Sequence, residues 1–193
     1  MPYRRVQFAP GHYYHLYNRG VDRQPIFGET ANYAFLLRRL QAYARSLQVT
    51  VIAYCLLGNH YHLLLRQDGE TPVGTLMQRV FNSYTKAYNQ RYGRQGTLFE
   101  GRYRAIHVDR ESYLRHVCRY IHANPVKHGF VEQVEAWPYS NYPEWVGARA
   151  GSLVDRPFVE GLFETGAAYR AFVEDYVSGL SKLPKGTEAY LID

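Results

Sequence analysis

A paired pattern of two apolar runs around a short turn most constrains the fold of this chain. The run Val49–Leu57 is almost wholly apolar and rich in β-branched residues, and a second run, His60–Arg66, follows the dipeptide Gly58-Asn59. Two such runs separated by two turn residues predict a β-hairpin. Glycine at the first turn position favours a type II′ turn, in which that residue has a positive φ.

Two histidines open the second predicted strand, at positions 60 and 62. Side chains alternate along a strand, so His60 and His62 project from the same face with Cα atoms roughly 6.5 to 7 Å apart. One cation can bridge that gap. A metal needs at least one more ligand, however, and histidines in strands also serve as hydrogen-bonding residues beside a core. Spacing alone leaves both interpretations open.

A second group of polar side chains falls in the segment Asp109 to Pro125, which predicts a helix. Asp109 can cap its start and Pro125 is expected to end it. One stripe, expected to face the core, consists of Leu114, Val117, Cys118 and Ile121. A neighbouring face carries Tyr113, His116, Tyr120 and Asn124. Tyr120 and Asn124 lie one turn apart, so a phenol and an amide project together, although core-flanking and capping roles also suit these two residues.

The order of predicted elements is β-α-β-β-α-β-α, which contains a split βαβ arrangement. It predicts an α+β, ferredoxin-like fold, with an antiparallel sheet and helices packed on one face. Residues 152–180 predict a small helical tail. We therefore expect a first domain over residues 1–147 and a C-terminal helical extension over residues 148–193.

Positive charge is concentrated in the first two thirds of the chain. Residues 1–128 carry a balance of +11 and residues 129–193 a balance of −5. A basic, arginine-rich surface favours a polyanionic partner, and 19 tyrosines offer stacking platforms for unpaired bases. The stretch from Arg91 to Arg104 predicts an irregular basic loop, which is either a nucleic-acid contact or an ordinary surface loop.

Two cysteines, Cys55 and Cys118, fall in segments expected to be buried, which indicates free thiols in a reducing compartment. No run reaches 18 apolar residues, and no apolar signal core follows Arg4 and Arg5. We therefore expect a cytoplasmic, nucleoid-associated protein with no membrane partner.

Several motifs together resemble one family, the single-tyrosine HUH transposases, and within it the IS200-like, REP-associated tyrosine transposases. Residues 57–64 (LGNHYHLL) resemble the metal-binding strand of the family, and residues 119–127 (RYIHANPVK) resemble its nucleophile helix. Residues 14–20 resemble its first strand and residues 137–142 the segment that closes the domain. The likeness extends from about Tyr13 to Trp145, and the middle residue of the metal motif, Tyr61, replaces a bulky apolar residue.

The resemblance implies roles for individual residues. Tyr120 is the nucleophile, and His60, His62 and Asn124 are ligands of a divalent metal, Mg²⁺ or Mn²⁺. Other branches have glutamine in place of Asn124. A free phenol, with a pKa near 10, is a poor nucleophile at neutral pH, so Tyr120 needs activation, for which Arg119 and His116 are candidates. The predicted DNA contacts are Arg19, Arg91, Arg94, Arg102, Arg104 and Arg119.

The implied activity is cleavage and rejoining of single-stranded DNA through a 5′-phosphotyrosyl intermediate, with palindromic repeat hairpins as substrate. Two other functions remain open. One is a DNA- or RNA-binding regulator that keeps the fold without cleavage, and the other is a metal-dependent hydrolase in which Tyr120 is structural. The sequence leaves open whether the protein is a monomer or a homodimer.

Overall fold

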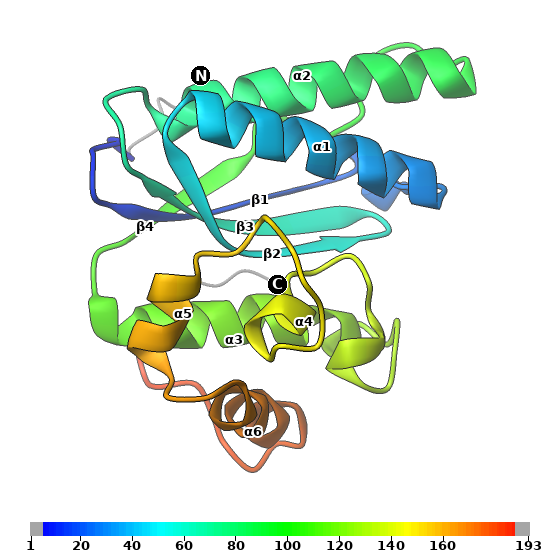
Figure 1. Ribbon diagram of the computed structural model, residues 1–193. Helices are drawn as coiled ribbons and strands as arrows, with labels where there is room; N and C mark the ends of the chain where they lie inside the picture. The colour runs from blue at the N-terminus through cyan, green and yellow to red at the C-terminus, as the bar shows by residue number, and fades with distance from the viewer. Residues whose placement is uncertain (1–5, 188–193) are drawn as a thin grey trace.

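Four antiparallel strands form the central sheet of the protein (Figure 1). The computed structural model describes residues 6–187. The strands are β1 (Tyr13–Arg19), β2 (Val49–Leu57), β3 (His60–Gln67) and β4 (Arg104–Val108), in the spatial order β2-β3-β1-β4. This order is that of a split βαβ sheet, so the predicted α+β class is confirmed.

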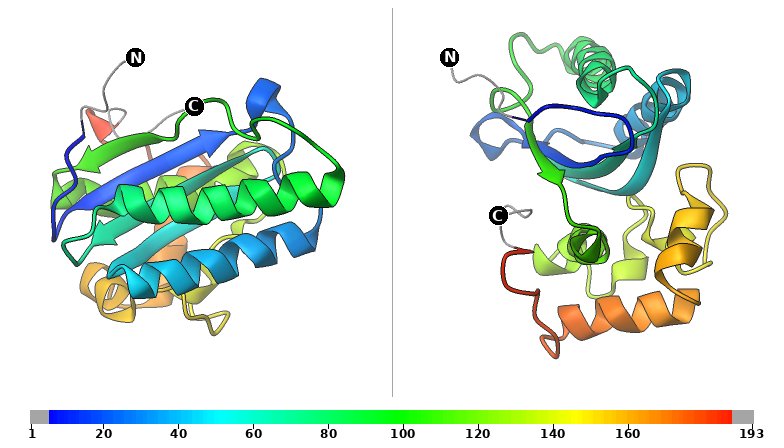
Figure 2. Two further views of the ribbon diagram at one scale, coloured as in Figure 1. Left: turned by 90° about the horizontal axis from the view of Figure 1, so that it is seen from above. Right: turned by 90° about the vertical axis from the view of Figure 1, so that its left-hand side faces the viewer.

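Two long helices cover one face of the sheet (Figure 2). They are α1 (Thr30–Ser46) and α2 (Val73–Tyr92). Their apolar stripes, including Leu36 and Leu40 of α1 and Leu76 and Val80 of α2, are fully buried against the sheet. This pair forms the predicted layer of helices on one face of the sheet.

The opposite face is covered by α3 (Glu111–Lys127), the helix that carries Tyr120. Both predicted ends of this helix were wrong. Arg110, not Asp109, precedes the first turn, and Pro125 lies inside the helix. Pro125 cannot donate the amide hydrogen bond to the Ile121 carbonyl, and its ring crowds that carbonyl, so the packing of this buried helix must offset a cost of about 3 kcal/mol. The backbone amides of His128 and Phe130 donate to the carbonyls of Asn124 and Pro125 and close that end.

The C-terminal segment continues the layer that contains α3. Its helices are α4 (Tyr142–Trp145), α5 (Arg156–Leu162) and α6 (Gly166–Val177), preceded by the 3₁₀ turn η2 (Val134–Ala136). Another 3₁₀ turn, η1 (Val21–Arg23), follows β1. Tyr169 and Val173 of α6 are fully buried in the same apolar cluster as Val117 and Ile121 of α3. The predicted division at residue 147 stays a prediction, and its last residues, 188–193, lie outside the described part.

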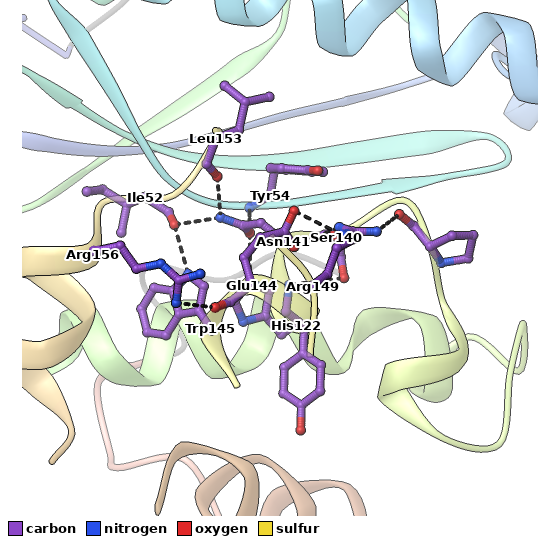
Figure 3. Close-up of polar contacts among 12 residues, drawn as sticks. Ile52, Tyr54, His122, Ser140, Asn141, Glu144, Trp145, Arg149, Leu153 and Arg156 are labelled. Carbon is purple, nitrogen blue, oxygen red and sulfur yellow. Dashed lines mark hydrogen bonds and ion pairs between the residues drawn. The ribbon is translucent and has the colours of Figure 1, made fainter. Parts of the chain in front are cut away.

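A buried polar network fixes α3 against the sheet (Figure 3). The Asn141 side chain accepts a hydrogen bond from the backbone amide of Tyr54 (2.8 Å) and donates one to the carbonyl of Ile52 (2.9 Å). His122 Nε2 donates to the same Asn141 oxygen at 2.9 Å, and Tyr169 donates to His122 Nδ1 at 2.6 Å. This network ties β2, α3 and α6 together, and therefore sets the position of Tyr120 on α3.

The β2–β3 hairpin has the predicted two-residue loop but not the predicted type II′ turn. Gly58 is not among the described residues with a positive φ, which that turn would require. Its carbonyl accepts hydrogen bonds from the backbone amides of Ile26 and Phe27, and the Asn59 carbonyl accepts one from Gly20. Tertiary contacts therefore hold this turn. Within residues 6–187, no helix is long and apolar enough to cross a membrane.

Candidate metal and nucleophile site

Strand β3 presents His60 and His62 toward α3, as the alternation predicts. Their ring centroids lie 5.3 Å apart with planes at 88°. His62 is 3% exposed, and His60 is half-buried. The intervening Tyr61 faces the opposite layer, where it stacks on Phe81 of α2. The two imidazoles thus share one small volume beneath the sheet.

Hydrogen bonds fix the orientation of both rings. His60 Nδ1 pairs with the Asn59 side-chain oxygen at 2.7 Å, and His62 Nδ1 pairs with His15 Nε2 at 3.1 Å. With both Nδ1 atoms engaged, a metal ion would be bound through Nε2 of each ring. Burial and the neighbouring His128 lower the pKa of His60 to about 4, and burial with His15 and His60 holds the pKa of His62 well below its usual value. Both rings are therefore neutral at pH 7, the state that binds a metal.

Helix α3 brings Tyr120 to the same place. The Tyr120 ring lies 5.7 Å from that of His62, with planes at 89°, and 6.2 Å from that of His15. Asn124, one turn later, donates from its amide nitrogen to the Tyr120 carbonyl at 2.8 Å. A side-chain hydrogen bond also joins Asn124 to His60. This bond favours the protonated ring and offsets only part of the lowering of the His60 pKa by burial. The four residues singled out by the sequence therefore converge.

The donor set suits a divalent metal only if Asn124 takes part. Among residues 6–187, no three His, Cys, Asp or Glu side chains form a group that could hold a metal ion. Two imidazole nitrogens and the amide oxygen of Asn124 supply three neutral ligands, which fits a divalent cation that keeps other positions open for water or substrate oxygens.

Two further histidines belong to this cluster, and the sequence reasoning gave neither a role. His15 is fully buried on β1. His128 follows α3, with its ring 4.9 Å from that of His60. His128 continues the spacing of Tyr120 and Asn124 by four more residues, a signal that could have identified it.

A basic cavity of about 530 Å³ opens onto the two histidines. Its wall includes Arg19, Arg23, Arg102 and Arg104, together with Tyr17, which stacks on His62 at 5.9 Å. Three of these arginines, Arg19, Arg102 and Arg104, are predicted DNA contacts, and Arg23 was not among the residues predicted. Arg19 forms an ion pair with Glu100 at the rim. The cavity has the charge and aromatic surface to hold a nucleic-acid backbone beside the histidines.

The other predicted arginine contacts lie elsewhere. Arg91 pairs with Glu29, and Arg94 lies over the Tyr88 ring, away from the cavity. Arg119 requires a correction. It is 2% exposed and contacts α6, with its guanidinium carbon 4.0 Å from the Phe172 ring centroid. In this position it is screened from a DNA backbone.

The suggested activators of Tyr120 bond to each other instead. Arg119 Nη2 pairs with His116 Nδ1 at 3.2 Å, and Arg119 Nη1 donates to Ser181 Oγ at 2.9 Å. These contacts join α3 to the C-terminal segment. Tyr113, from the same predicted face, donates to the Lys185 carbonyl at 3.2 Å. The predicted polar face of α3 is therefore divided between the histidine cluster and the C-terminal segment.

Comparison with known proteins gives concordant results. Residues 9–124 match the family described as Transposase IS200 like. The chain is 26% identical, over 141 residues, to the REP-associated tyrosine transposase of Escherichia coli strain K12. The aligned region covers 72% of this chain and 81% of that protein. The fold matches a solved REP-associated tyrosine transposase bound to a REP hairpin, with a TM-score of 0.64 and 22% identity over 80% of this chain and 94% of that one. The resemblance predicted from the sequence is confirmed.

Proposed function

Since the chain belongs to the IS200-like transposase family, we propose that it is a metal-dependent endonuclease and strand transferase acting on single-stranded DNA. Tyr120 is its nucleophile, and palindromic repeat hairpins are its substrate. The observation that carries this proposal is the meeting of Tyr120 of α3 with His60 and His62 of β3, at 5.7 Å between the rings of Tyr120 and His62.

The reaction is an exchange of phosphodiester bonds. The Tyr120 oxygen attacks the scissile phosphorus, loses its proton, and forms a bond to the 5′ phosphate. The bond from phosphorus to the 3′ oxygen breaks, and that oxygen leaves as a 3′-hydroxyl. Attack by another 3′-hydroxyl reverses these events and releases Tyr120. Since one phosphodiester replaces another, no external energy source is needed.

The side chains of this site divide the remaining tasks. His60, His62 and Asn124 would hold the metal, which would neutralise charge on the phosphate and orient it for in-line attack. Arg102 and Arg104 bind neighbouring phosphates in the cavity. His15 keeps the His62 ring in place through its 3.1 Å hydrogen bond.

The choice of substrate rests on shape and on relatives. A flexible strand can bend into a cavity below the edge of a sheet more easily than a duplex can. A protein with the same fold is bound to a REP hairpin, and the curated relative carries the same REP-associated name. These observations support hairpins with single-stranded flanks as the substrate of this chain.

One observation favours a second candidate, a hairpin-binding regulator that does not cut. The Tyr120 side chain is 3% exposed and is not part of the cavity wall. Catalysis therefore requires the strand to displace groups that cover the phenol, whereas binding in the cavity does not.

The test is a denaturing gel of purified protein with labelled hairpin DNA and Mg²⁺ or Mn²⁺. We expect a covalent protein–DNA adduct that is lost in Tyr120→Phe, lost in His62→Ala and lost with a chelator. Tyr113→Phe, a matched change on the same helix, retains it. Binding without any adduct supports the regulator, and metal-dependent cleavage that survives Tyr120→Phe identifies a hydrolase.

A further inference from the structure

A second cavity lies on the other face of the sheet, between α2 and the loop that leads into β4. Its volume is about 570 Å³. In Figure 2, α2 runs along the outer side of the sheet, and the chain returns from its end toward β4. No described Asp or Glu lines this cavity, and none of the residues proposed to react or to hold the metal belongs to it.

Aromatic rings form part of the cavity wall. Tyr61 and Phe81 stack with centroids 4.2 Å apart and planes at 16°, and Phe99 meets both rings edge-on at 5.9 and 5.4 Å. Tyr61 and Phe81 are buried, so the ring surface open to a ligand is that of the half-buried Phe99 and Tyr103, which also line the cavity and favour a flat aromatic ligand. The stacking of Tyr61 on Phe81 also explains why a tyrosine between the two metal-binding histidines faces away from them.

Amide side chains supply the polar part. Gln78 and Asn82 lie one turn apart on α2, are exposed, and both line the cavity. An amide offers a donor and an acceptor side by side, which matches the edge of a nucleobase. The wall thus combines ring surfaces with hydrogen-bonding groups, as expected for a site that binds an unstacked base.

The two cavities meet at the end of β1. Asn18 and Arg102 line both of them. Asn18 donates to the Gly101 carbonyl at 3.3 Å, and the amide of Glu100 donates to the Arg19 carbonyl at 2.9 Å. The cavities are therefore separated only by residues 18–19 and the segment 100–101 that is hydrogen-bonded to them. A strand that passes the histidines can continue over Arg102 and reach α2.

We propose that the second cavity binds one unpaired nucleobase of the DNA strand whose scissile phosphate lies at the histidines. Arg102 contacts the phosphate between the two positions, and Gln78 and Asn82 hydrogen-bond to the edge of the base. This inference rests on the proposed function and deepens it, because it gives the enzyme a means of selecting the nucleotide beside the cleavage point.

The test measures equilibrium binding of Tyr120→Phe protein, which cannot form the adduct, to hairpins with single-stranded arms. The arms are homopolymers of adenine, cytosine, thymine or guanine, and a matching arm carries abasic sites. We expect the double variant Gln78→Ala/Asn82→Ala to lose about tenfold in affinity for at least one base-containing arm, and to bind the abasic arm unchanged. Gln90→Ala, an exposed residue of the same helix outside the cavity, is the control.

Equal losses on base-containing and abasic arms would show that these amides contact only the backbone, and no loss on any arm would show that the cavity is unused. Either result overturns the inference. Failure of the proposed function gives a different pattern: wild-type protein forms no adduct, while the base-dependent loss in the double variant persists.

Discussion

At the scale of single residues, the most informative contact is the hydrogen bond between His15 and His62. A metal-binding imidazole needs its second ring nitrogen held by a partner, which fixes both the tautomer and the ring orientation. His15 Nε2 supplies that partner at 3.1 Å, from a fully buried position on the neighbouring strand. We therefore expect His15 to act as a positioning residue for His62 in the proposed metal site, without being a ligand itself.

Replacing His15 tests this role directly. We expect His15→Leu to weaken Mn²⁺ binding by about 10- to 100-fold, because the His62 ring loses its partner. His15→Gln, whose amide oxygen can accept the hydrogen bond from His62 Nδ1 in place of His15 Nε2, retains most of the affinity. The measurement is calorimetric titration with Mn²⁺, and His12→Ala, an exposed histidine near the same strand, is the control. Unchanged affinity in His15→Leu would contradict the role.

At the scale of elements, α3 is held by a buried histidine that cannot easily accept a proton. His122 Nε2 donates to Asn141, and Nδ1 accepts from Tyr169. Burial lowers the pKa of His122 to about 4. An unfolded histidine has a pKa near 6.5, so between these values the unfolded state binds more protons than the folded state. The free energy of unfolding therefore falls as the pH drops from about 6.5 to about 4.

A variant of this residue isolates its share of the pH dependence. We expect His122 to account for a loss of up to about 1.4 kcal/mol per pH unit within that window. His122→Gln, which does not titrate, has a shallower dependence than the wild type. Urea unfolding at pH 7 and pH 5 measures the difference. Parallel curves for both proteins would show that His122 does not contribute.

At the scale of the whole molecule, the C-terminal segment completes the lower layer of the fold. Tyr169 is fully buried among aromatic rings, 4.5 Å from Trp145 and 4.8 Å from Phe163 between ring centroids. Arg119 and His122 of α3 bond to this segment as well. The helix that carries Tyr120 therefore lies between the sheet and α6.

Removal of this segment is expected to destabilise the first 147 residues. Tyr169→Ala should lower the free energy of unfolding by about 3 to 5 kcal/mol, as for other large aromatic residues in a core. A chain ending at residue 147 should lose cooperative unfolding. Denaturant melts measure both, with Leu180→Ala, which is 82% exposed, as the control. A stable, cooperative 1–147 chain would instead support an independent first domain.

Much of the site could be predicted because its spacing lies within single elements. Alternation along β3 is sufficient to put His60 and His62 on one face, and the spacing of α3 is sufficient to put Tyr120 above Asn124. The α+β class followed from the order of apolar patterns. The prediction of a type II′ turn was wrong because the geometry of the Gly58-Asn59 turn depends on hydrogen bonds from the backbone amides of residues 20, 26 and 27. No local sequence pattern contains these bonds.

The sequence alone determined the chemical groups, their local spacing and the excess of positive charge in the first two thirds of the chain. The tertiary structure decided which of those groups meet. It joined His15 to His62 across neighbouring strands, gathered Arg19, Arg102 and Arg104 around one cavity, and buried Arg119 beneath α6. The physical reason is that the periodicity of a helix or strand fixes the direction of its side chains. Which side chains of different elements come together depends instead on strand pairing and on packing between distant segments.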